Sequence, residues 1–240
     1  ASEVNSIWLA EALKEALKDA QEVGWGKPLR LRCWRTSMKT IVKRAALEVG
    51  IEIVASRRTY ALLEWLAERE KELYPFQEGY LTGPLAPPPS QQKNQPLPLP
   101  EAVRGDSWSF DSLPLGLLRE AKEWSIEFSG LLPVNEAASN EISITGLRLF
   151  SKTRSLALAA WLGGLEPVKL AIQENQLILE AGQNDRWLVT ALEQQTAKEV
   201  KQVLINAKEK AAGLQFISVQ ANPDDQVFTG FWMLRDLAEL

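Results

Sequence analysis

Apolar residues recur at helical spacing in three stretches of the first 75 positions. The first stretch follows Ser6, which we expect to cap a helix that carries a stripe of leucines. Two further helices and two short apolar strands follow it, and Pro75 ends the helical pattern. The predicted strands are residues 29–34 and 51–55, and the predicted helices are residues 36–49 and 59–73. This alternation predicts an N-terminal α/β unit over residues 1–75.

The second half of the chain is richer in strand patterns. Thr196 and Glu199 have the spacing of a capping box for a helix that ends near residue 212. The final two apolar runs flank the turn at 222–225 and predict a hairpin. The other predictions are strands at 124–128, 142–150, 168–172, 177–180, 187–192, 214–220 and 227–234 and a helix at 153–162. We therefore expect a second α/β unit over residues 106–240, with the larger, mixed sheet.

A proline-rich segment separates the two units. Eight of the thirteen prolines fall between Pro75 and Pro100, which favours an extended, polyproline-like linker at residues 76–105. Its PxxP spacings could also bind in the groove of an SH3-like domain, although nothing else in the sequence indicates such a partner. The two units share a loose order of strand, basic turn, apolar helix and strand, so a duplicated α/β unit is a further hypothesis.

Composition excludes several kinds of chemistry. The chain has no histidine, which removes Ser-His-Asp and Cys-His nucleophiles and imidazole metal ligands. Cys33 is the single cysteine, so neither an internal disulfide nor a cysteine metal cluster can form. The longest apolar run, residues 156–165, is about half the length that a membrane-spanning helix needs. We expect no metal, no cofactor and no membrane span.

Motifs for catalysis are also missing. A metal-dependent nuclease would need a Glu-x-Lys pattern on a strand, and neither Glu52 nor Glu180 is followed by a lysine at that spacing. Gly163-Gly164 is not part of a phosphate-binding or dinucleotide-binding glycine loop. The sequence therefore predicts a protein that is not an enzyme.

Charge is distributed unevenly. The net charge is −4, but the window from Lys27 to Arg58 holds nine basic and two acidic residues and carries +7. Arg35, Lys39 and Lys43 share one face of the predicted helix because they are four residues apart. Arg57 and Arg58 follow a predicted strand. These five cations are candidate phosphate contacts.

Aromatic residues lie beside these cations in the sequence. Trp34 and Tyr60 are candidate stacking residues, and the chain holds nine tryptophans in all. Cations that hold a backbone, together with aromatic rings on which bases stack, are what single-stranded RNA recognition requires. The alternative is a solvated helix face whose arginines pair with Glu64 and Glu68. From composition alone both interpretations stay open.

The sequence resembles the Tab-type RNA-binding proteins of cyanobacteria, algae and plants over nearly its whole length. The shared words are Arg35 with Met38, residues 56–62, 65–69, 74–75, 97–98 and 104–106, Trp108, residues 159–162, 164–167 and 179–180, Gly182, residues 185–187, 219–220, Pro223 and residues 230–234. Members usually begin with a further strand upstream of Asn5, which is not in this sequence, so we expect the first sheet to be one strand short.

The resemblance implies a function. It implies binding to A/U-rich messenger RNA leaders, support for translation of photosystem I reaction-centre subunits and for photosystem biogenesis, and neither catalytic residues nor a cofactor. It also implies a cyanobacterial cytoplasm or a chloroplast stroma. The family supplies no settled RNA-contacting residues, so the site prediction rests on charge and on the shared Ser-Arg-Arg word.

A second function from a different class remains open. Phe231, Trp232, Met233 and Leu234 could form an apolar contact for a translation or photosystem assembly protein. The alternative is a strand of the C-terminal sheet that buries these residues on its two faces.

Overall fold

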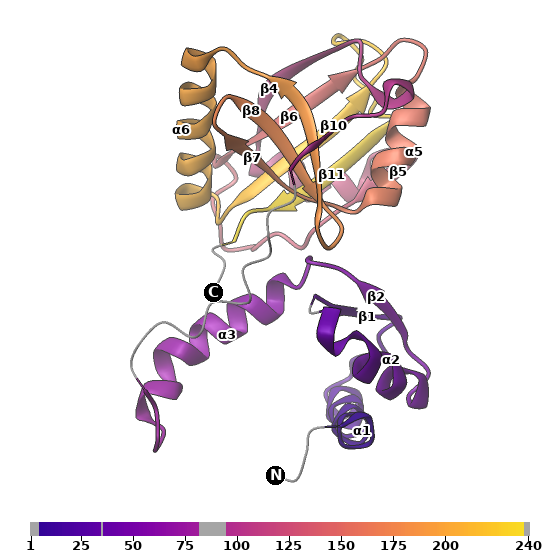
Figure 1. Cartoon of the computed structure of the whole chain (residues 1–240), viewed down its shortest axis with the longest axis vertical. Coiled ribbons are helices and arrows are strands. Elements are labelled where there is room, and N and C mark those ends of the chain that lie inside the picture. Colours follow the sequence, from indigo (N-terminus) through magenta and orange to yellow (C-terminus); the bar gives the residue numbers. More distant parts are fainter. Residues whose placement is uncertain (1–4, 35, 82–94, 238–240) are drawn as a thin grey trace. The chain divides into compact units, whose positions relative to one another are not determined.

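The chain divides after Leu66 into two units (Figure 1). The computed structural model describes residues 5–34, 36–81 and 95–237. Much of the predicted linker at 76–105, namely residues 82–94, lies outside the described residues. The mixed α/β class predicted from the sequence is confirmed. Among the described residues, no helix combines the length and apolarity needed to cross a membrane.

The first unit begins with α1 (Ser6–Glu22). Its cap is Asn5, whose side-chain oxygen accepts hydrogen bonds from the backbone N–H groups of Ile7 and Trp8, each at 3.0 Å. The expectation that Ser6 is the cap is therefore wrong by one residue. Asn5 takes this position because its side-chain amide oxygen satisfies two of the helix's unpaired N–H groups.

A β-α-β unit follows. The strands β1 (Arg30–Cys33) and β2 (Glu52–Ala55) pair in parallel, and α2 (Lys39–Glu48) connects them after a 3-10 turn at Thr36–Met38. α2 buries Ala45 and Ala46. The last helix of this region, α3 (Tyr60–Glu72), begins five residues after β2 and crosses the division between the units. The predicted order of helices and strands is confirmed here.

The second unit holds two sheets. The five-stranded sheet has the order β4-β6-β10-β11-β5 and mixes parallel with antiparallel pairs, as predicted, while the four-stranded sheet has the order β3-β9-β8-β7. The strands of this unit are β3 (Leu97–Pro98), β4 (Ser107–Pro114), β5 (Phe128–Gly130), β6 (Ser143–Phe150), β7 (Pro167–Gln173), β8 (Gln176–Ala181), β9 (Asp185–Ala191), β10 (Leu214–Gln220) and β11 (Gly230–Arg235). Its helices are α4 (Leu115–Arg119), α5 (Ser155–Leu165) and α6 (Gln194–Lys210).

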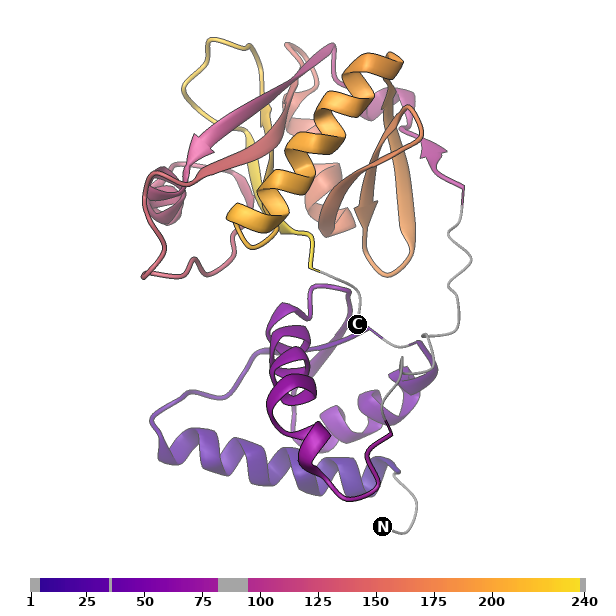
Figure 2. The same ribbon diagram turned by 90° about the vertical axis from the view of Figure 1, so that its left-hand side faces the viewer.

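Both faces of the five-stranded sheet are covered. One face packs against α5 and the inner side of the four-stranded sheet, and its buried residues include Ile217 and Trp232. The opposite face packs Phe216 and Phe231 against α4 and the segment between α4 and β5. Figure 2 shows α6 lying across this unit beside the hairpin of β7 and β8. Alternating side chains of β10 and β11 thus supply two separate cores.

Two sequence expectations in this unit are wrong, and one strand is missing from them. Residues 124–127 form a loop and the strand begins only at Phe128, because Trp124 and Ile126 are held by packing in the second core rather than by a ladder. The capping box is also wrong, since α6 starts at Gln194 and places Thr196 within its first turn. β4 was not expected, although its residues alternate between polar and apolar.

Candidate nucleic-acid interface

The carboxyl ends of β1 and β2 form one edge of the first unit. The strands are parallel and in register, with Cys33 opposite Ala55, so the residues that follow each strand come out side by side. Trp34 follows β1, and the loop of Ser56, Arg57 and Arg58 follows β2. Open α/β sheets bind ligands at this end of their strands.

Hydrogen bonds fix the loop after β2. The Ser56 backbone N–H donates to the carbonyl oxygen of Cys33 at 3.2 Å, and the buried Ser56 hydroxyl oxygen accepts from the Arg58 N–H at 3.0 Å. The Thr59 N–H donates to the Arg57 carbonyl at 2.8 Å. Arg57 and Arg58 therefore stand on a backbone that is tied to the neighbouring strand.

Arg57 meets Trp34 across the two strand ends. The guanidinium carbon of Arg57 lies 5.8 Å from the centre of the Trp34 ring, within the range of a cation–π contact. Both side chains are half-buried. The predicted cation and the predicted stacking residue are thus neighbours in space.

Two helical segments begin at the same edge. The 3-10 turn at Thr36–Met38 leads into α2 from the end of β1, and α3 begins at Tyr60, two residues after Arg58. The N-terminus of a helix favours an anion, since its first N–H groups have no intrahelical partner. Phosphate groups would therefore be favoured here by backbone dipoles as well as by side chains.

The predicted lysines lie on α2. Lys39 is its first residue and Lys43 lies one turn further along, and both are exposed. Arg35 lies outside the described residues. Tyr60, the second predicted stacking residue, is half-buried at the start of α3. The structure thus joins Trp34 and Arg57 directly and places the two lysines on the helix that leads away from the same edge.

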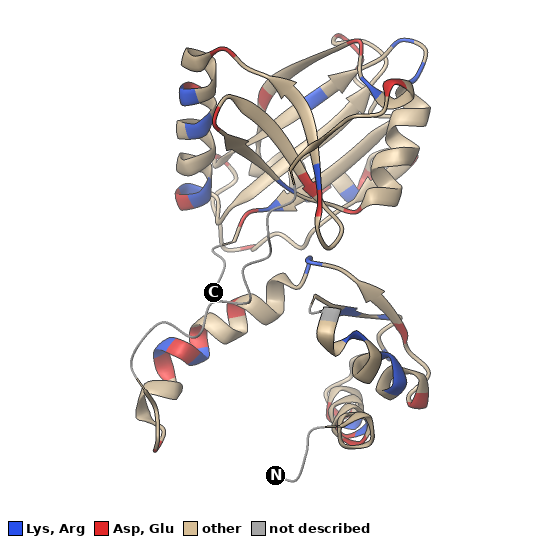
Figure 3. Cartoon of the chain, viewed as in Figure 1, with Lys and Arg blue, Asp and Glu red and all other residues tan. Residues whose placement is uncertain are grey.

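The two units differ in net charge. Residues 1–66 carry a net +3 and residues 67–240 a net −7. Figure 3 shows Lys and Arg of the first unit on β1, on α2 and in the loop between β2 and α3. A polyanion is therefore attracted to the first unit more than to the second.

The apolar segment near the end of the chain lies inside the second unit. β11 lies between β10 and β5, and it contains Phe231, Trp232, Met233 and Leu234, which are 0–2% exposed. Phe231 and Met233 belong to one core, Trp232 and Leu234 to the other. A partner could contact these four residues only if the strand left the sheet.

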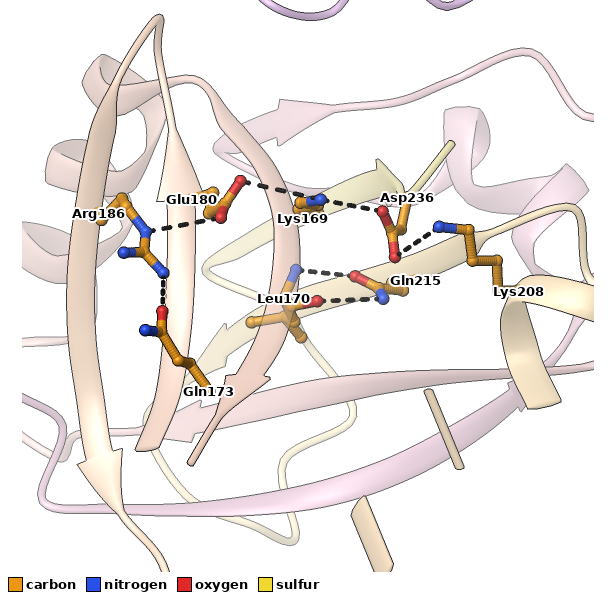
Figure 4. A network of polar contacts seen from close by, with 8 residues as sticks. All are labelled: Lys169, Leu170, Gln173, Glu180, Arg186, Lys208, Gln215 and Asp236. Carbon is orange, nitrogen blue, oxygen red and sulfur yellow. Dashed lines mark hydrogen bonds and ion pairs between the residues drawn. The ribbon is translucent and has the colours of Figure 1, made fainter. Parts of the chain in front are cut away.

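A partly buried charge network in the second unit was missed by sequence reasoning (Figure 4). Glu180 on β8 lies between Lys169 on β7, at 3.9 Å, and Arg186 on β9, at 3.6 Å. Asp236 pairs with Lys169 at 3.1 Å and with Lys208 of α6 at 3.4 Å. Three cations thus balance two carboxylates, with Lys169 shared between them, which is the arrangement of a structural network.

One further contact links the two sheets of this unit. The Gln215 side chain on β10 accepts from the Leu170 N–H at 2.8 Å and donates to the Leu170 carbonyl at 3.3 Å. It pairs with the backbone of β7 as a neighbouring strand would. Together with the ion pairs of Asp236, it fastens the four-stranded sheet to the five-stranded one.

Comparisons with known proteins identify the family of the chain. Residues 1–69 match the family model described as RNA-binding protein Tab2/Atab2 N terminal, and residues 86–235 match RNA-binding protein Tab2/Atab2, C-terminal domain. The chain is 32% identical over 249 residues to the chloroplastic TAB2 homolog of Zea mays and 31% identical over 244 residues to that of Arabidopsis thaliana.

These alignments cover 98% of this chain but 61% and 64% of the two relatives, so the chain spans about three-fifths of their length. No solved structure matches the chain. Because the two family models together cover most of the sequence, the chain belongs to the Tab2/Atab2 family of RNA-binding proteins.

Proposed function

We propose that the chain binds single-stranded RNA, without catalysis, at the edge where β1 and β2 end. The observation that carries this proposal is the position of Arg57 over the Trp34 ring, in a loop that leads into one helix and beside a turn that leads into another. The family supports the class of ligand, since both matching models describe RNA-binding proteins.

Each residue type has a distinct task in this proposal. The guanidinium groups of Arg57 and Arg58 donate forked hydrogen bonds to phosphate oxygens, and Lys39 and Lys43 add charge along α2. A base stacks on Trp34, and Tyr60 is a second stacking position. Arg35 belongs to the same proposed set by its place in the sequence, directly after Trp34.

The target we propose is an A/U-rich leader of a messenger RNA that encodes a photosystem reaction-centre subunit. The protein would support translation of that subunit and photosystem biogenesis. The family resemblance supports this target and a cyanobacterial cytoplasm or a chloroplast stroma as its setting. Of these two settings, the chloroplastic relatives from maize and Arabidopsis support the chloroplast.

Fluorescence anisotropy of labelled RNA tests the proposal. The probes are an A/U-rich single strand and a GC-rich strand of the same length, each at low and at moderate salt. The variants are Arg57→Gln/Arg58→Gln and a control with the same loss of charge, Lys14→Gln/Lys18→Gln on α1, where both lysines are exposed.

We expect the wild type to bind the A/U-rich strand more tightly, and we expect Arg57→Gln/Arg58→Gln to lose that binding while the control keeps it. Equal losses in the two variants would mean that net charge, not this edge, holds the RNA. If the folded wild type bound neither strand, a protein-interaction role would replace the RNA-binding one.

A further inference from the structure

The strands β1 and β2 have an exposed face that sequence reasoning did not select. Along β1, Arg30 and Arg32 are exposed, whereas Leu31 and Cys33 are half-buried. Successive side chains of a strand point to opposite faces, so the two arginines share one face. Glu52 is the register partner of Arg30 and lies on that face with it. We call this side the outer face of the β1–β2 sheet: its exposed residues are Arg30, Arg32 and Glu52, and the half-buried Val54 lies opposite Arg32.

The opposite face is occupied by the connecting helix. A crossover between two parallel strands places its helix on one side of the sheet. α2 contacts both strands and buries Ala45 and Ala46, and Ile51, the residue before β2, is buried as well. The arginines therefore project from the side of the sheet that α2 does not cover.

We propose that the outer face extends the RNA interface, so that a strand held at Trp34 continues over Arg32 and Arg30. The inference rests on the proposed function. Arg30 and Arg32 are two residues apart on a strand, about 6.6 Å, and Arg32 and Trp34 are also two residues apart. This spacing suits successive phosphates of an extended single strand. A sheet face that presents cations next to an aromatic ring is also a known way to hold single-stranded RNA.

In the free protein, Glu52 pairs with Arg30 and so competes with RNA for the outer face. Its carboxylate oxygen lies 2.9 Å from Nε of Arg30, and the two side chains are 62% and 60% exposed. Such an exposed ion pair is weak, so a phosphate group can take the place of the carboxylate. The same carboxylate repels the backbone of the bound strand. Replacing Glu52 should therefore strengthen binding, which is an effect that simple loss of structure cannot produce.

RNA length separates this inference from the proposed function. The experiment measures anisotropy with an A/U-rich strand of about 6 nucleotides, whose phosphates fill the edge at Trp34, and one of about 12, which can also reach the outer face. The variants are Arg30→Gln/Arg32→Gln and Glu52→Gln. The controls are Lys14→Gln/Lys18→Gln for lost cations and Glu48→Gln, an exposed acid on α2, for a lost anion.

For the longer strand we expect Arg30→Gln/Arg32→Gln to weaken binding about tenfold and to reduce the salt slope by about 1.4. We expect Glu52→Gln to strengthen it about two- to threefold. The affinity of both variants for the short strand should stay within about twofold of the wild-type value. The affinity of both control variants for either strand should stay within the same range.

Two results would overturn the inference. If the wild type bound the longer strand but Arg30→Gln/Arg32→Gln behaved like its control, the outer face would carry no RNA and the edge at Trp34 would stand alone. If the folded wild type bound neither strand, the proposed function would fail and this inference with it.

Discussion

Arg57 and Trp34 meet because two parallel strands end at the same place. The guanidinium carbon lies 5.8 Å from the ring centre, and the register of β1 with β2 brings the two residues together from distant parts of the sequence. A cation beside an aromatic ring serves both halves of a nucleotide, since the base stacks on the ring and the phosphate pairs with the cation. This pair defines the centre of the proposed RNA interface.

Trp34→Leu should weaken RNA binding by about 1–3 kcal/mol, the usual contribution of one stacked base. Trp25→Leu is the matched control, because Trp25 lies in the same unit and is highly exposed. Anisotropy titrations with the same A/U-rich strand compare the two variants, and circular dichroism checks that both are folded. Equal affinity of the two variants would exclude Trp34 as a stacking residue.

Gly146→Ala should destabilise the second unit by about 3 kcal/mol. A Cβ atom at Gly146 would overlap the ring and the carbonyl oxygen of Phe216 in the neighbouring strand, and a packed core cannot yield there without strain. Gly164→Ala is the control, since a Cβ there meets nothing within 4 Å and alanine favours the helix. Urea unfolding measures both. If the two variants were equally stable, the close packing of Phe216 on β10 against Gly146 on β6 would be contradicted.

Glu180→Leu should cost about 3 kcal/mol of folding free energy. The substitution removes the carboxylate that lies between Lys169 and Arg186, and removal of one member of a buried ion pair leaves uncompensated charge. Glu209→Leu, at an exposed position of α6, is the control and measures the change in stability when one surface acid is lost. Thermal unfolding at neutral pH compares the two. A Glu180 variant as stable as the Glu209 variant would show that the network contributes nothing to stability.

Asp106 should make stability depend on acidic pH. Its pKa is lowered from the ordinary value of 3.8 because the side chain of Arg154, the backbone N–H of Lys152 and the hydroxyl of Ser151 donate hydrogen bonds to the carboxylate. A lowered pKa stabilises the fold above 3.8, and this contribution is lost as the pH falls through the folded-state pKa.

The measurement for Asp106 is the midpoint of thermal unfolding between about pH 2 and pH 6, for the wild type and for Asp106→Asn. The variant should be less stable near pH 6, and the difference should shrink as the pH falls below 3.8. Asp224→Asn, in the exposed turn before β11, is the control. A difference that stays constant over this range would argue against the hydrogen-bonded carboxylate.

Much of the fold follows from local pattern. Helical spacing locates α1, α2, α3 and α6, and apolar runs locate β6, β10 and β11, because each buries a regular set of side chains. The sequence pattern mispredicts an element where contacts between residues distant in the sequence determine the local structure. Trp124 and Ile126 alternate as in a strand, yet packing in the second core holds them in a loop, and Glu193 rather than Thr196 precedes α6.

The proposed RNA interface can be predicted only in part from the sequence. Charge and aromatic content point to Trp34 and Arg57, but their contact depends on the parallel pairing of β1 with β2. Strand alternation is the signal that separates Arg30 and Arg32 from the two apolar residues of β1. The network around Glu180 has no such signal, because its charges come from three strands, a helix and the residue after β11.

The salt dependence of RNA binding tests the central claim most directly. Affinity of the wild type and of Arg57→Gln/Arg58→Gln for the short A/U-rich strand of about 6 nucleotides, which is confined to this edge, is measured over a series of salt concentrations. About five neutralised phosphates predict a slope of log K against log salt near −3.5 for the wild type, and loss of two contacts predicts a slope shallower by about 1.4. A wild-type slope near zero, or the same slope in both proteins, would contradict phosphate binding at the edge where β1 and β2 end.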